Sequence, residues 1–110
     1  MSFVATQNKG FGITFQNGFT ISVQWGTENY CEHKNLDINF EDLPKPKENN
    51  RWESRSAEIA VFNDTGIVPI GDSDDVIGWC SADEVAKVIK IVSSTTDLDK
   101  MKSKIKKLNI

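Results

Sequence analysis

The stretch FGITFQNGFTISVQW, residues 11–25, determines the expected fold class of this chain. Apolar residues occupy alternate positions on both sides of Asn17-Gly18: Phe11, Ile13 and Phe15 before it, then Phe19, Ile21, Val23 and Trp25 after it. Such alternation is typical of half-buried strands, and Asn-Gly is the commonest hairpin dipeptide. The stretch therefore predicts an antiparallel β-hairpin.

The parity of the alternation determines the length of the hairpin loop. A two-residue loop at Asn17-Gly18 would pair Phe15 with Thr20, which sends the two apolar rows to opposite faces of the sheet. A three-residue loop over Gln16-Asn17-Gly18, with Gly18 left-handed in a G1 bulge, keeps the rows on one face. We therefore expect the three-residue loop, with these pairs: Phe15 with Phe19, Ile13 with Ile21 and Phe11 with Val23.

A second hairpin is expected further along the chain. Residues 57–62 form a strand-like run, residues 63–66 have turn composition, and the apolar run resumes at residues 67–70. A four-residue loop pairs Val61 with Val68 and Ile59 with Ile70. Because Pro69 has no N–H to donate, the second strand is expected to be an edge or irregular strand. After a turn at residues 71–75, a short last strand is expected at residues 76–80.

Two helices are expected to follow. Ser81 and Glu84 form a capping box, and one apolar stripe then recurs at helical spacing, at Val85, Val88, Ile89 and Val92. Thr95 or Thr96 is the candidate N-cap of a terminal helix. That helix carries an apolar stripe and a basic patch: Leu98, Met101, Ile105 and Leu108, with Lys100, Lys102, Lys104, Lys106 and Lys107.

These elements predict the α+β class, because a run of strands precedes a run of helices. We expect an antiparallel β-sheet of two hairpins plus one or two short strands. One amphipathic helix packs on it, and a Lys-rich C-terminal helix follows. A length of 110 residues fits one α+β domain over residues 1–94, followed by the helix at residues 95–110.

Composition and charge argue against some classes of function. The formal net charge is −3, with six Lys or Arg against twelve Asp or Glu in residues 1–80 and seven Lys against four acids in residues 81–110. A small acidic protein of this kind is not expected to be a dedicated nucleic-acid binder. No apolar run is long enough to span a membrane, and the first residues lack a signal-peptide pattern. We therefore expect a cytoplasmic protein in which Cys31 and Cys80 are free thiols.

A set of short motifs resembles small uncharacterised proteins encoded by tailed bacteriophages and prophages. The motifs lie at residues 10–31 (Gly-Phe, Phe-Gln-Asn-Gly, Ser-Val-Gln-Trp-Gly and Asn-Tyr-Cys), at residues 57–61 (Ala-Glu-Ile-Ala-Val) and at residues 83–86 (Asp-Glu-Val-Ala). The resemblance covers roughly residues 9–94 and leaves out the lysine-rich tail. It implies a viral protein that works in the cytoplasm of a bacterial host, and it implies no reaction.

The binding surface is expected in the polar part of the chain. Residues 26–56 are rich in charge, proline and asparagine, with one short strand expected at residues 36–40, and long irregular segments are usually functional. Trp52 beside Arg51 has no apolar neighbours, which is the composition of a binding hot spot. We expect a contact surface formed by Trp52, Arg51, Tyr30, Asp72, Asp74 and Asp75. Trp25 and Trp79 are expected in the core.

Catalytic and metal sites were weighed against simpler interpretations. Cys31 or Cys80 with His33, the single histidine, could form a nucleophile pair, and Cys80 beside the helix N-cap is the better candidate. The same residues lack the spacing of a structural zinc site. Asp72, Asp74 and Asp75 do not continue into a calcium loop. No catalytic residue, metal or cofactor is assigned.

The expected function is that of a non-enzymatic phage accessory protein that binds, and by binding can inhibit, a host or phage protein. One alternative is a small nucleic-acid-associated protein that uses the C-terminal lysines. Another is a small Cys/His-dependent enzyme. A homo-oligomer through Leu98, Met101, Ile105 and Leu108 is also considered, whereas attachment to a membrane is not expected because this stripe lacks aromatic residues.

Overall fold

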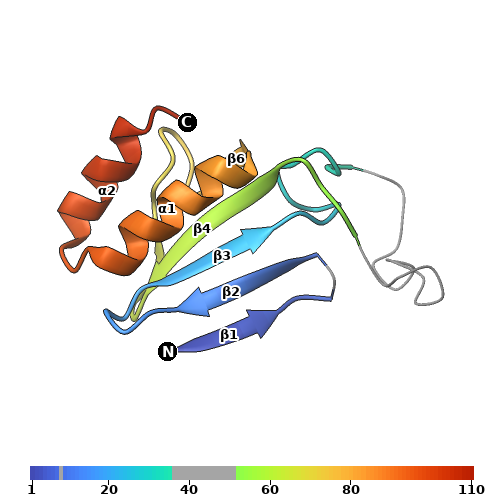
Figure 1. The fold of residues 1–110 in the computed structure, drawn as a ribbon. Helices are drawn as coiled ribbons and strands as arrows, with labels where there is room; N and C mark the ends of the chain where they lie inside the picture. The colour runs from blue at the N-terminus through green and yellow to red at the C-terminus, as the bar shows by residue number, and fades with distance from the viewer. Residues whose placement is uncertain (8, 36–51) are drawn as a thin grey trace.

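The computed structural model describes residues 1–7, 9–35 and 52–110. Within these residues the chain forms an antiparallel sheet and two helices, in agreement with the expected α+β class (Figure 1). The strands are β1 (Ser2–Ala5), β2 (Gly10–Thr14), β3 (Thr20–Gln24), β4 (Ala57–Asn63), β5 (Gly66–Val68) and β6 (Ile77–Cys80), and the helices are α1 (Ala82–Ser94) and α2 (Leu98–Lys107). The short strand expected at residues 36–40 lies outside the described residues.

The sheet follows the chain order from β1 to β5, and β6 returns to β4. Both β5 and β6 pair with β4 and run antiparallel to it: β5 lies beside the end of β4 and β6 beside its beginning. The two short strands therefore act as one interrupted strand along β4. The loop between them projects from the sheet at the point where the interruption occurs.

The β2–β3 hairpin has the register that a three-residue loop requires. Phe11 pairs with Val23 and Ile13 with Ile21. The N–H of Phe15 donates to the carbonyl of Phe19 at 2.9 Å, and Gly18 has a φ of 93°. The left-handed conformation of Gly18 allows the odd-numbered apolar residues of both strands to share one face.

The second hairpin agrees with the expectation at one pair and departs from it at another. Val61 pairs with Val68, but the strands extend to an Asn63–Gly66 pair. The expected Ile59–Ile70 pair is wrong, because Ile59 pairs with Ile77 of β6 instead. Pro69 explains the difference: it cannot donate to a ladder, and β5 ends at the residue before it.

Strand β1 was not expected from the sequence. It pairs with β2 through Phe3–Ile13 and Ala5–Phe11 and forms one edge of the sheet. All four of its residues are exposed. Because the strand is short and lacks a polar face, its pattern does not distinguish it from an irregular segment.

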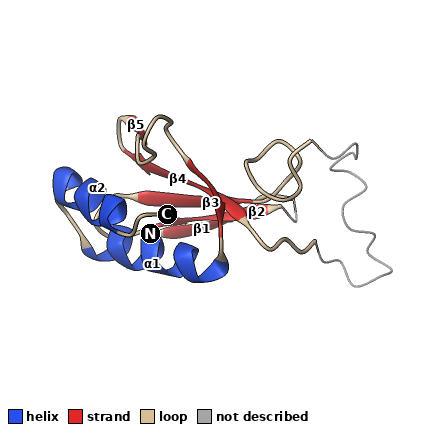
Figure 2. Cartoon of the chain, turned by 90° about the horizontal axis from the view of Figure 1, so that it is seen from above, coloured by secondary structure: helices blue, strands red, loops and turns tan. Residues whose placement is uncertain are grey.

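The helices form a layer on one face of the sheet (Figure 2). Helix α1 packs against β3 and β4, and α2 packs against α1. The capping box of α1 is confirmed, since Ser81 Oγ accepts from the N–H of Glu84 and Glu84 Oε1 accepts from the N–H of Ser81. The N-cap of α2 is Asp97, so the expectation of Thr95 or Thr96 is wrong: Thr95 is the C-cap of α1.

The core joins the sheet to both helices. Its fully buried members include Ile21, Ile59, Val88, Met101 and Ile105. Two residues of the stripe on α2 therefore pack inside the chain's own core, which leaves Leu98 and Leu108 as the parts accessible to a second copy. No helix in the described parts of the chain combines the length and apolar character needed to cross a bilayer.

Candidate functional site

A β-bulge in β6 turns Trp79 out of the sheet. Ala57 pairs with Cys80 and Ile59 with Ile77, so one residue of β4 lies opposite two residues of β6, Gly78 and Trp79. Trp79 has a φ of 51°, which is rare for a residue other than glycine or asparagine. Its side chain is 59% exposed. Bulges of this kind commonly redirect a side chain near a functional site.

The backbone of Tyr30 is fixed against the bulge from two sides. Its N–H donates to Glu58 Oε2 at 2.9 Å, and its carbonyl accepts from the N–H of Trp79 at 2.8 Å. Asn29 Nδ2 donates to the other carboxylate oxygen of Glu58 at 3.2 Å. Glu58, the residue of β4 opposite the bulge, therefore joins the loop at Tyr30 to the sheet.

Gly78 allows this close approach. A Cβ at that position would lie 2.6 Å from the Cβ of Tyr30, so a larger residue would push the loop away. The approach brings the rings of Tyr30 and Trp79 to a centroid distance of 5.6 Å, within the range of aromatic pairs. On the Tyr30 ring, Lys34 Nζ lies 5.3 Å from the centroid, within the range of a cation–π contact.

The two rings border a surface hollow of about 420 Å³. Its opposite wall is the loop between β5 and β6, which includes Asp72 and Asp74. We call Tyr30, Trp79, Asp72, Asp74 and Asp75 the aromatic–acidic surface. All five residues are exposed. Within the described residues, none of the three carboxylates forms an ion pair.

The aromatic–acidic surface contains part of the contact surface expected from the sequence. Tyr30, Asp72 and Asp74 line the same hollow, and Asp75 follows Asp74 directly. Trp52 does not line it, and Arg51 lies outside the described residues. Trp79, which we expected in the core, takes the place of Trp52.

Trp52 is half-buried and has structural contacts. Its indole N–H donates to the carbonyl of Trp25 at 3.3 Å, and the indole N–H of Trp25 donates to the carbonyl of Trp52 at 2.9 Å. The ring of His33 packs on Trp52 with centroids 4.4 Å apart. These contacts attach residues 52–56 to the loop after β3, so the half-buried ring of Trp52 is only partly available to a partner.

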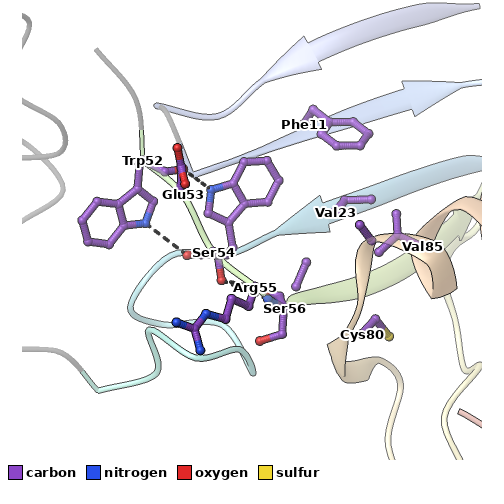
Figure 3. A pocket seen from close by; sticks show the side chains of 12 residues that line it. Phe11, Val23, Trp52, Glu53, Ser54, Arg55, Ser56, Cys80 and Val85 are labelled. Atoms are coloured by element: carbon purple, nitrogen blue, oxygen red, sulfur yellow. Dashed lines mark hydrogen bonds between the residues drawn. The ribbon is translucent and has the colours of Figure 1, made fainter. Parts of the chain in front are cut away.

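A second cavity, of about 370 Å³, lies between these tryptophans and the start of α1 (Figure 3). Phe11, Val23 and Val85 form its apolar wall, and Cys80 lies at one end. Burial, with a smaller contribution from Glu84, raises the pKa of the Cys80 thiol to about 11. A catalytic thiol requires the opposite shift, so the cavity does not activate Cys80 as a nucleophile at neutral pH.

Cys31 and His33 do not form a nucleophile pair through their side chains. Cys31 Sγ donates to the carbonyl of Gly26 at 3.4 Å, and burial raises its pKa. His33 Nε2 contacts the carbonyl of Glu53 at 2.6 Å. No cluster of three or more His, Cys, Asp or Glu suited to a metal ion occurs in residues 1–7, 9–35 and 52–110.

The basic patch lies on the exposed side of α2. All five of its lysines are exposed: Lys100, Lys102, Lys104, Lys106 and Lys107. Lys102 and Lys106 share a hollow of about 380 Å³ with Asp72. The basic patch therefore borders the acidic loop on one side, and a bound polyanion would meet a carboxylate there.

Comparison with known proteins yields no relative. No protein family, curated protein or solved structure matches the chain. The site is therefore interpreted from its geometry and chemistry alone.

One feature of the sequence indicates the bulge. Gly78 interrupts the strand-like run Ile77-Gly78-Trp79-Cys80, and an isolated glycine inside a strand suggests a bulge or a close backbone contact. The contact of Tyr30 with Glu58 and Trp79 has no local indication, because the three residues are far apart in the sequence.

Proposed function

We propose that this chain is a non-enzymatic accessory protein that acts by binding another protein through the aromatic–acidic surface. The observation that supports the proposal best is the outward position of Trp79 on a left-handed backbone. Such a conformation costs about 1–2 kcal/mol for a residue other than glycine. Exposing a large aromatic ring in this way leaves more than half of its surface in water, whereas Trp and Tyr are enriched at binding hot spots.

The charge around the rings indicates the chemistry of the partner. Asp72 and Asp74 line the hollow and Asp75 follows them in the chain, and none of the three forms an ion pair within the described residues. A partner with a basic segment would complement these carboxylates, and complementary charge speeds association. An arginine or lysine could also stack on the exposed face of Trp79, as Lys34 does on Tyr30. We therefore expect a basic segment on the partner.

The biological setting that we propose rests on the motif resemblance of residues 9–94 to small phage and prophage proteins, and not on the geometry of the site. On that basis the partner is a host or phage protein, the compartment is the cytoplasm of the bacterial host, and inhibition of the partner is the effect to be tested. Because burial raises the pKa of both thiols, neither Cys31 nor Cys80 is activated as the nucleophile of a Cys/His-dependent enzyme.

A pull-down from bacterial lysate tests this proposal. Tagged wild type, the double variant Tyr30→Ala/Trp79→Ala and the control Ile67→Ala are compared with and without nuclease, and the bound proteins are quantified by mass spectrometry. Ile67 is an exposed apolar residue of β5 outside the hollow, so its removal controls for a general loss of apolar surface.

We expect a protein that wild type and Ile67→Ala retain after nuclease treatment and that the double variant loses at least tenfold. Equal recovery by the double variant and wild type would contradict the placement of the surface. Recovery that depends on nucleic acid would contradict the proposed mode of binding.

Nucleic-acid binding through α2 is the second candidate, because all five lysines of the basic patch are exposed. Deleting α2 is not a clean test, since Met101 and Ile105 belong to the core. Replacing the five lysines with glutamine retains the helix and removes the charge. If this candidate is correct, the replacement abolishes salt-sensitive retention on DNA or RNA; unchanged retention contradicts it.

A further inference from the structure

Strand β1 exposes one whole edge of the sheet. It pairs with β2 on its inner side, and within the described residues nothing pairs with its outer side. The unpaired N–H and C=O groups of an edge strand can pair with another strand. This edge is separate from the aromatic–acidic surface, so an occupant of the edge is independent of the proposed function.

The ladder to β2 shows which groups face outward. The N–H of Thr6 donates to the carbonyl of Gly10 at 2.9 Å, which makes Thr6 and Gly10 a hydrogen-bonded pair. Because hydrogen-bonded and non-hydrogen-bonded pairs alternate along an antiparallel ladder, Val4 pairs with Gly12 through hydrogen bonds as well. Phe3 and Ala5 therefore direct their N–H and C=O groups to the open edge.

The side chains of β1 do not protect this edge. Residues 1–8 contain no charged side chain and no proline, the two features that commonly protect natural edge strands. Phe3 is 83% exposed on the face that carries the helices, and Val4 is 59% exposed on the opposite face. An occupant of the edge must therefore be a strand that tolerates apolar contacts on both faces.

We propose that the outer edge of β1 pairs antiparallel with β1 of a second copy, with Val4 opposite Val4 at a two-fold axis. This register places Phe3 opposite Ala5 of the other copy. All the outward N–H and C=O groups of these two residues are then used in hydrogen-bonded pairs, and a large side chain lies opposite a small one. A strand that is complementary to itself in this way favours a symmetric dimer.

The register also determines how the two sheets join. Residues directly opposite each other in an antiparallel pair point to the same face, so Phe3 and Ala5 keep both helical layers on one side of a continuous sheet. Within each copy Phe3 lies next to Ile13 and Ala5 next to Phe11, which are only partly covered. Pairing therefore joins the apolar side chains of β1 and β2 in the two copies into one continuous row on that face.

The mass in solution is the first test, measured by size exclusion with light scattering. We expect wild type and the control Ile67→Lys, which adds a charge at the opposite edge, to show about twice the 12.3 kDa of one chain. Val4→Lys places two lysines face to face, and Ala5→Pro removes an outward N–H without disturbing the ladder to β2, so both should be monomers. A monomeric wild type, or folded variants that remain dimeric, would overturn the proposal.

Cross-linking tests the register. In Val4→Cys the new thiols lie opposite each other in a non-hydrogen-bonded pair, where side chains are closest and a disulfide can form. In the control Ser2→Cys the two thiols are separated by four residues of strand, or about 13 Å. We expect mild oxidation to link Val4→Cys at least tenfold faster. Equal rates for the two variants, or no linked dimer, would contradict the register.

Discussion

At the scale of single residues, Trp79 connects the fold to the proposed function. The one-against-two bulge gives Trp79 a left-handed backbone, and the hydrogen bond to Tyr30 keeps it there. The backbone that carries the exposed ring is therefore fixed, and the ring packs beside Tyr30, before any partner arrives. A rigid aromatic side chain loses little conformational entropy on binding, which favours affinity.

The backbone conformation of Trp79 can be tested with two substitutions that both remove the ring. Asparagine tolerates the left-handed region, whereas a β-branched residue does not. We expect Trp79→Val to unfold with a free energy about 1 kcal/mol lower than that of Trp79→Asn, measured by urea denaturation. Equal free energies of unfolding would indicate that the bulge relaxes when the ring is removed.

The buried thiol of Cys80 should make stability sensitive to alkaline pH. An unfolded thiol loses its proton near the ordinary pKa of 9.0, whereas the folded one retains it up to about 11. Between these values only the unfolded state releases the proton, so the free energy of unfolding falls as the pH rises. From pH 9 to pH 11 it should fall about 2 kcal/mol further in wild type than in Cys80→Ala. Parallel pH profiles would contradict the raised pKa.

At the scale of elements, Asn17 joins the first hairpin to α1. Its Nδ2 donates to the carbonyl of Val92 at 2.7 Å and to that of Thr95 at 3.1 Å, while its Oδ1 accepts from the N–H of Phe19. A loop residue therefore satisfies carbonyls at the C-terminus of the helix, which otherwise lack partners within the helix. This contact positions α1 over β3 and β4.

The substitution Asn17→Asp removes this contact with α1 but keeps the preference of the residue for the turn. Aspartate retains the turn and the acceptor, but it loses both donated bonds and places a negative charge at the negative end of the helix dipole. We expect the free energy of unfolding to fall by about 1–3 kcal/mol. Asn63→Asp is the matched control, because within the described residues the Asn63 side chain only accepts hydrogen bonds, both from Thr65. The free energy of unfolding of this variant should stay within about 0.5 kcal/mol of wild type. Equal losses in both variants would contradict the bridging role.

Structure that depends on residues close together in the chain could be predicted from the sequence, whereas structure that depends on distant residues could not. The first hairpin and the capping box depend on residues close together in the chain, so their patterns contain the necessary information. The N-cap of α2, the end of β5 at Pro69 and the partner of Ile59 depend on competition among segments that are far apart. Tyr30 and the acidic loop could be proposed as site residues, but their contact with Trp79 requires a bulge and a distant glutamate, Glu58.

At the scale of the whole molecule, the surface has three regions: the open edge at β1, the aromatic–acidic surface and the basic patch. Helix α1 packs over β3 and β4, and β1 at the far side of β2 forms the exposed edge that is available for self-association. The aromatic–acidic surface lies at the bulge in β6, next to the basic patch of α2. A dimer through β1 would retain two copies of this surface, since neither Tyr30 nor Trp79 belongs to that edge.

The proposed function requires that the ring of Trp79 contacts the partner directly. This contact is tested by a calorimetric titration of the protein recovered in the pull-down with purified wild type, Trp79→Ala and the control Ile67→Ala. For Trp79→Ala we expect a loss typical of a hot spot, about 2 kcal/mol or roughly thirtyfold in Kd, and no change for the control. A Kd for folded Trp79→Ala within about twofold of wild type would show that the ring does not contact the partner, because energetically neutral contacts have effects of only that size.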